Sequence, residues 1–222
     1  SDQWRSARTR MERKRIAEMG TWIIGGFCTG LRGEEMALID LAGTRRSVEE
    51  GMGPAATDPH FKFVIIGRTK GVQQDGHKFA IPCVAVTQGT GLRPGIWVER
   101  LLAVLAENKR TNGKLFVRAL IPAKMMEFEN DFFELLERVQ ATTDLIPQSV
   151  DVRDEFGIGR SGRRGVTAHA RNLRIGDDLL KAINRWGKEA NTLVGVPRLD
   201  MPDTYTTLRA ILPLVLEFSR SL

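Results

Sequence analysis

The sequence contains two strand-like runs, FKFVII at residues 61–66 and KFAIPCV at residues 78–84, in a chain whose other apolar residues mostly follow helical spacing. Both runs are rich in β-branched and aromatic residues, which pack well on a pleated surface. The polar segment Gly67–His77 joins them. We therefore predict a β-hairpin, so the fold is not expected to be all-helical.

Helical periodicity surrounds the predicted hairpin. Before it, residues 16–30 form a helix candidate interrupted by Gly25 and Gly26, and residues 31 to 41 form a second candidate. After it, two apolar stripes have helical spacing: Trp97, Leu101, Leu102, Leu105, and then Phe128, Phe132, Leu135, Leu136, Val139. Further elements are predicted as a short strand at Leu115–Val117 and helices at Arg163–Asn172 and Asp177–Trp186. We expect a mainly α fold with a small antiparallel β-sheet.

The composition is that of an ordinary globular protein, with 42% hydrophobic and 27% charged residues among 222. No apolar run approaches the roughly 18 residues that a membrane helix needs, so we expect no membrane partner. The chain shows no internal repeat and no clear domain boundary. We predict a polar, basic segment at residues 1–15, frayed or leading into a helix, followed by one domain at residues 16–222.

The two cysteines, Cys28 and Cys83, stand in apolar contexts and fit neither a metal pair nor a disulfide framework. They are interpreted as free core thiols of a protein in a reducing compartment, the nucleus of a eukaryotic cell or otherwise the cytoplasm. The net charge of +6 and the isoelectric point near 9.7 favour a polyanionic partner.

Five short motifs stand out along the chain, and four of them contain basic residues. They are TGLRGEE at residues 29–35, IGRTK at residues 66–70, GRSGRRG at residues 159–165, NRW at residues 184–186 and DTY at residues 203–205. Three arginines in seven residues of GRSGRRG are an unusual density of guanidinium. Tyr205 is the only tyrosine in the chain.

In this order the motifs resemble the catalytic domain of the tyrosine recombinases, the phage-integrase class that includes Cre. A eukaryotic tyrosine-recombinase mobile element is one expected source. The resemblance covers nearly the whole chain and implies the catalytic-domain fold of that family. It also implies the catalytic residues, which in this sequence are Arg32, Lys70, Arg160, Arg163, Trp186 and Tyr205. Glu35 is expected to brace Arg32, and Arg68 and Arg164 are expected to bind DNA.

The chain departs from the family's pattern in three respects. Arg160 stands where the family usually has histidine, and the segment between Trp186 and Tyr205 is longer than usual. The N-terminal DNA-clamping domain of the family is not found in this sequence. The three histidines, His60, His77 and His169, are poor substitutes for the missing one, because two are predicted in loops and the third is off the helical face of Arg163.

The expected chemistry explains why these residue types are needed. Arg32 and Arg163 would hold two phosphate oxygens, because guanidinium is always charged and presents a planar fork of donors. Lys70 would protonate the departing 5′-oxygen, and the indole N–H of Trp186 would donate to the phosphate. Tyr205, with an ordinary pKa of about 10, would be the nucleophile. Arg160 cannot accept its proton and would act electrostatically.

The sequence thus predicts a site-specific recombinase or transposase domain that cuts and rejoins double-stranded DNA through a 3′-phosphotyrosyl intermediate. It would require no metal ion and no cofactor, and it would form a homo-oligomer on DNA. Two alternatives remain open: a type IB topoisomerase-like enzyme that relaxes DNA, and a domesticated DNA-binding module that has lost turnover. Residues 203–222 dock on an adjacent subunit in one hypothesis and fold back onto their own core in the other.

Overall fold

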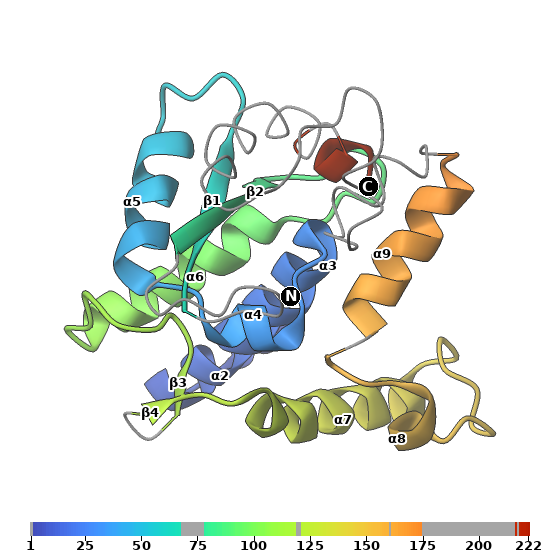
Figure 1. The fold of residues 1–222 in the computed structure, drawn as a ribbon. Coiled ribbons are helices and arrows are strands. Elements are labelled where there is room, and N and C mark those ends of the chain that lie inside the picture. The colour runs from blue at the N-terminus through green and yellow to red at the C-terminus, as the bar shows by residue number, and fades with distance from the viewer. Residues whose placement is uncertain (1, 68–77, 119–120, 160, 175–215, 217) are drawn as a thin grey trace.

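The computed structural model describes residues 2–67, 78–118, 121–159, 161–174, 216 and 218–222 (Figure 1). Within these residues the helices and strands follow one another as α1 (Asp2–Ser6), α2 (Arg10–Gly20), the π-helical turn η1 (Thr21–Gly25), α3 (Gly26–Thr29), α4 (Gly33–Ala37), α5 (Leu41–Gly51), β1 (His60–Ile66), β2 (Lys78–Val84), α6 (Pro94–Glu107), β3 (Val117–Arg118), β4 (Ile121–Pro122), α7 (Met125–Thr142), α8 (Val152–Glu155) and α9 (Ser161–Asn172). The described part of the chain is therefore mainly helical with a small antiparallel sheet, as predicted.

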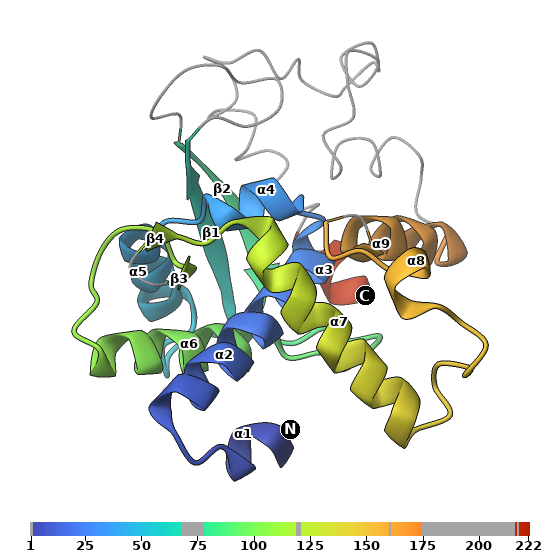
Figure 2. The same ribbon diagram turned by 90° about the horizontal axis from the view of Figure 1, so that it is seen from below.

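The predicted hairpin is confirmed. Strands β1 and β2 pair antiparallel, with Phe61 opposite Cys83 and Phe63 opposite Ile81. Helix α5 covers one side of the hairpin, and α6 and the α2–α3 segment lie on the other (Figure 2). Most of the strand residues are buried as a result, which explains why the runs are nearly continuous in apolar residues rather than alternating.

The N-terminal helix begins earlier than the sequence predicts. Thr9 caps α2, since its hydroxyl accepts from the backbone N–H of Glu12 while the Glu12 carboxylate accepts from the N–H of Thr9. The expected interruption at Gly25 and Gly26 is absent, because the chain runs from α2 through η1 into α3 with helical backbone angles. The helix ends at Gly30, whose φ of 60° is the left-handed conformation that glycine adopts most easily.

The prediction of one helix over residues 31–41 is wrong. Two short elements, α4 and the start of α5, occupy this region, and Ile39 and Asp40 between them are extended. The backbone N–H of Asp40 donates to the carbonyl of Val64, so this segment joins the edge of β1. The Asp40 carboxylate then caps α5 by accepting from the N–H of Gly43 at 2.7 Å.

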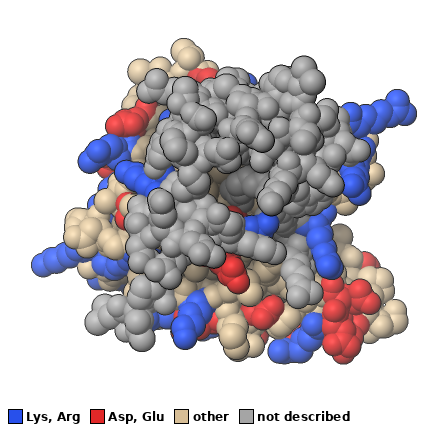
Figure 3. Space-filling view, in the orientation of Figure 1, with Lys and Arg blue, Asp and Glu red and all other residues tan. Residues whose placement is uncertain are grey.

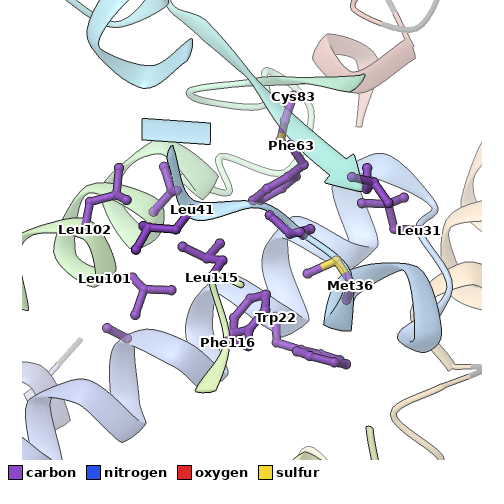
Figure 4. Close-up of a cluster of buried hydrophobic side chains, with 14 of the residues drawn as sticks. Trp22, Leu31, Met36, Leu41, Phe63, Cys83, Leu101, Leu102, Leu115 and Phe116 are labelled. Atoms are coloured by element: carbon purple, nitrogen blue, oxygen red, sulfur yellow. The ribbon is translucent and has the colours of Figure 1, made fainter. Parts of the chain in front are cut away.

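The core contains most residues of the predicted apolar stripes, whereas Trp97 and Val139 are half-buried and lie outside it. Trp22 stacks on Phe128, with ring centroids 4.3 Å apart, and meets the edge of Phe116 at 4.9 Å. Leu101, Leu102 and residues from both strands surround this aromatic group (Figure 4). Leu115 and Phe116 are fully buried, and the short strand β3 begins at Val117, two residues after the predicted start at Leu115.

Two predicted helices near the end of the chain have different outcomes. The one at 163–172 is confirmed as α9, which packs against α3 with Gly165 beside the ring of Phe27 (Figure 1). The one at 177–186 lies outside the described residues. No helix in the described part of the chain is long and apolar enough to cross a membrane.

The described end of the chain folds back onto its own core. Leu216, Phe218 and Leu222 are buried, and the N–H of Gln88 donates to the carbonyl of Arg220 at 2.8 Å. Arg220 also forms an ion pair with Asp58. Residues 216 and 218–222 therefore pack on their own chain, whereas residues 203–215 and 217 lie outside the described part. Docking of this segment on an adjacent subunit when DNA is bound stays a prediction.

Candidate phosphate-binding site

Arg32 stands immediately before α4 and is held there by Glu35. The backbone N–H of Arg32 donates to Oε2 of Glu35 at 2.8 Å, and the guanidinium Nη1 lies 3.8 Å from Oε1 of the same carboxylate. The Glu35 side chain is only 5% exposed, whereas that of Arg32 is 29% exposed. One buried carboxylate therefore fixes both the backbone and the side chain of an arginine that still reaches the surface, as expected for a bracing residue.

Gly33, the residue after Arg32, contacts Gly159, the first residue of the GRSGRRG motif. A Cβ atom added to Gly33 would lie 3.3 Å from Cα of Gly159 and 2.3 Å from Sδ of Met125. A Cβ atom added to Gly159 would lie 2.6 Å from the same sulfur. A Cβ atom at Gly33 would press on the backbone of Gly159 as well as on Met125, whereas a Cβ atom at Gly159 would meet only the flexible end of Met125. The Met125 thioether fills the angle between the two backbones. We call this contact of Gly33, Met125 and Gly159 the glycine junction.

The glycine junction brings two of the predicted site segments together. Arg32 precedes Gly33 directly, and α9, which carries Arg163 and Arg164 in its first turn, begins two residues after Gly159. The side chain of Arg164 is exposed. Arg160 and the side chain of Arg163 lie outside what the structure describes.

We expect Gly33→Ala to lower DNA cleavage roughly 10- to 100-fold, because misplacing catalytic groups by a fraction of an ångström weakens transition-state binding. The Met125 side chain can move aside, but the backbone of Gly159 cannot do so without shifting α9. Single-turnover cleavage rates measure the effect. Gly26→Ala is the matched control, since a Cβ there would meet only Met36 at 3.9 Å and alanine suits its helical backbone. Equal rates for the two variants would contradict the role of the junction.

The loop end of the hairpin is fastened to the end of α4. The N–H of Ile66 donates to the carbonyl of Leu38 at 3.2 Å, and Gly67 packs against the Leu38 side chain. The Lys114 ammonium donates to two carbonyls, that of Leu38 at 3.1 Å and that of Ile66. Burial lowers the pKa of Lys114, while the charge of Asp40 opposes the shift. The hairpin loop with Arg68 and Lys70, which lies outside the described residues, thus starts from a point fixed to the Arg32 helix.

Lys114→Met is expected to lower the free energy of unfolding by about 1–3 kcal/mol, because it leaves two partly buried carbonyls without their common donor. Chemical denaturation measures this change. Lys109→Met provides the control: that side chain is exposed, and its loss should change stability by less than about 0.5 kcal/mol. A similar small effect at Lys114 would show that the ammonium does not fasten the hairpin.

Much of the charge in the predicted basic segment is neutralised within the molecule. Arg10 and Arg13 pair with Glu107, and Arg15 pairs with Asp131. The fully buried Glu18 lies 3.0 Å from the Lys14 ammonium and 3.9 Å from Arg118. Burial raises the pKa of Glu18, and these two cations oppose the shift. This network joins α2, β3 and α7 and stabilises the fold, so the net charge of the chain overstates the charge of segment 1–15 toward a partner.

The N-terminal segment leads into a helix, which is one of the two predicted alternatives. It forms α1 and the start of α2, and the Arg100 guanidinium of α6 lies 5.0 Å from the ring centroids of both Trp4 and Trp97. Cation–π contacts of this kind hold α1 against α6.

The remaining predicted site residues are only partly described. Arg68, Lys70, Arg160, Trp186 and Tyr205 lie outside the described residues, so their catalytic or DNA-binding roles stay predictions. Of the histidines, His60 is hydrogen-bonded through Nδ1 to the carbonyl of Asp58 at 2.8 Å, which fits a satisfied histidine near the surface. His169 is half-buried in α9, and His77 is outside the described part.

The sequence prediction missed Met125, which packs at the glycine junction, and Lys124, which precedes Met125 in the chain. A signal was present: Lys124 and Glu127 repeat the spacing of Arg32 and Glu35. In both cases a cation precedes a helix and a glutamate three residues later accepts its backbone N–H at 2.8 Å.

The chain was compared with known proteins. No family model matches it, and no curated protein matches it. The resemblance to tyrosine recombinases therefore rests on the sequence motifs.

Proposed function

We propose that this chain is a DNA strand-cutting and rejoining domain of the tyrosine recombinase or transposase type. The glycine junction is the observation that supports the proposal best. Residues 33 and 159 are far apart in sequence, and the resemblance assigns a phosphate-binding arginine beside each of them. If these arginines were unrelated surface residues, nothing would require the backbone beside each of them to approach the other at a glycine.

In the proposed reaction, the Tyr205 oxygen attacks the phosphorus in line with the 5′-oxygen. The tyrosyl–phosphorus bond forms as the bond to the 5′-oxygen breaks, and Lys70 gives the departing oxygen its proton. Arg32 and Arg163 stabilise the charge on the two non-bridging oxygens, and Trp186 donates a further hydrogen bond. Arg160 favours loss of the phenolic proton to water. Rejoining reverses these steps with a 5′-hydroxyl as the nucleophile, so the phosphodiester bond energy is conserved.

The test uses the wild-type chain and nicked duplexes drawn from the DNA that flanks its gene. Cleavage beside the nick releases a short fragment, so the 3′-phosphotyrosyl adduct cannot be reversed and survives denaturation. We expect a covalent adduct on a subset of the duplexes. Binding without any adduct would overturn the enzyme and leave the domesticated DNA-binding module.

Arg160 favours a second candidate, because type IB topoisomerases also use a basic residue other than histidine at this point of the same chemistry. Such an enzyme would relax supercoiled plasmid without paired specific sites. A recombinase would instead exchange strands between two copies of one site. The two activities are distinguished by adding plasmids with none, one or two candidate sites.

The proposed surroundings of the enzyme follow from the same residues. Cys28 and Cys83 are buried free thiols, as predicted, which fits a reducing compartment: the nucleus in a eukaryote or otherwise the cytoplasm. The proposed partners are double-stranded DNA and further copies of the chain assembled on it. Figure 3 shows a group of acidic side chains over the α8 end, a region that DNA would avoid.

A further inference from the structure

Lys124 precedes α7 in the way that Arg32 precedes α4. The N–H of Lys124 donates to Oε2 of Glu127 at 2.8 Å, the same length as the bond between Arg32 and Glu35. Each glutamate is the third residue of its helix, so each fixes the backbone of the cation at the helix start. Two cations are thus presented by two helices through the same local arrangement.

The two helix starts lie side by side. Met125, the first residue of α7, packs its sulfur against Gly33, the first residue of α4, and against Gly159. Figures 1 and 2 show the start of α7 beside α4 from two directions. Lys124 is one residue from this contact, as is Arg32 on the other side. Its four-carbon stem gives the ammonium the reach to meet a ligand held at the junction.

The charge of Lys124 is available to a ligand, in contrast to the cations of the internal network. The Lys124 side chain is exposed, and no carboxylate in the described part of the chain forms an ion pair with it. Lys14, Arg15 and Arg118 are each held by an acidic partner. An unpaired exposed lysine alone is ordinary, but this one stands where a phosphate-binding arginine is proposed.

We propose that Lys124 binds a backbone phosphate of the DNA, next to the phosphate held by Arg32 and Arg163. The inference rests on the proposed function. A lysine ammonium acts as a point charge and reads no base, so the contact strengthens binding equally on all sequences and positions the duplex in the site.

The experiment measures the affinity of the full chain for a short mixed-sequence DNA duplex over a series of salt concentrations. Lys124→Gln is compared with Arg138→Gln, a control that removes the same charge from an exposed position near the other end of α7. At a rise of about 1.5 Å per residue, that control lies about 20 Å from Lys124. Both variants change the net charge equally, so a difference between them reports a direct contact.

We expect Lys124→Gln to reduce the slope of log affinity against log salt by about 0.9, the value for one lost phosphate contact. Arg138→Gln should keep the wild-type slope, and Lys124→Arg should restore it. Thermal unfolding of each variant checks that the fold is kept. Equal slopes for the two glutamine variants would overturn the role of Lys124 while leaving the proposed function intact. A wild-type chain that does not bind the duplex would overturn both.

Discussion

Tyr205→Phe is expected to abolish the covalent protein–DNA adduct while leaving DNA affinity unchanged. Phenylalanine keeps the ring but has no oxygen to attack phosphorus. Tyr205 is the only tyrosine of the chain, so no other phenol can replace it. Denaturing electrophoresis of the nicked-duplex reaction measures the adduct, and a binding assay under the same conditions measures affinity.

Thr206→Val is the control for this prediction. It removes a hydroxyl group beside Tyr205 and should retain the adduct. An adduct that persists in Tyr205→Phe, or that maps to a serine or threonine, would contradict the assignment of the nucleophile. Loss of DNA binding together with the adduct would point to a structural effect instead.

Arg32→Lys is expected to slow cleavage by about 100- to 1,000-fold, although it conserves the charge. Loss of a preorganised donor to a transition-state oxygen removes about 3–4 kcal/mol of stabilisation, and an ammonium cannot reproduce the two-point grip of guanidinium. The buried Glu35 carboxylate, 3.8 Å from Nη1, would also lose its planar partner. Single-turnover rates at saturating DNA isolate this effect from binding.

The control is Arg10→Lys, which makes the same replacement in an exposed ion pair with Glu107. Exposed pairs contribute about 1 kcal/mol or less, so cleavage and stability should stay near the wild-type values. Near-wild-type cleavage by Arg32→Lys would argue against a phosphate clamp at this position. A large fall in thermal stability would instead assign Arg32 a role in the fold.

The hairpin and the buried stripes could be predicted from the sequence because their signals are local. The apolar run at 61–66 and the helical spacing from Leu101 to Leu105 each depend only on which residues of one element face the core. The split at Ile39 and Asp40 could not be predicted in this way. It depends on a hydrogen bond to Val64 in β1, and that partner is known only once the hairpin has been placed.

The candidate site shows the same division. The sequence identified Arg32 with Glu35 because both belong to one short motif, and the structure has them in contact. Met125 and Lys124 join the site only through the approach of Gly33 to Gly159, which no local pattern in the sequence encodes. The Lys124–Glu127 spacing repeats that of Arg32 and Glu35, but it does not show that the two helix starts lie together. The positions of Lys70, Trp186 and Tyr205 relative to this site stay predictions.

The attachment of α9 has a thermodynamic consequence. This helix meets α3 at Gly165 and Phe27, and its leading segment meets the starts of α4 and α7 at a small and a flexible residue, Gly33 and Met125. A phosphate held by Arg32 and Arg163 together would bind the docked arrangement and not the undocked one. Ligand binding and helix docking would then be linked equilibria, each shifting the other by the same free energy. On that basis bound DNA would hold α9 against the rest of the chain. Amide hydrogen exchange in α9 would then slow as the duplex concentration rises.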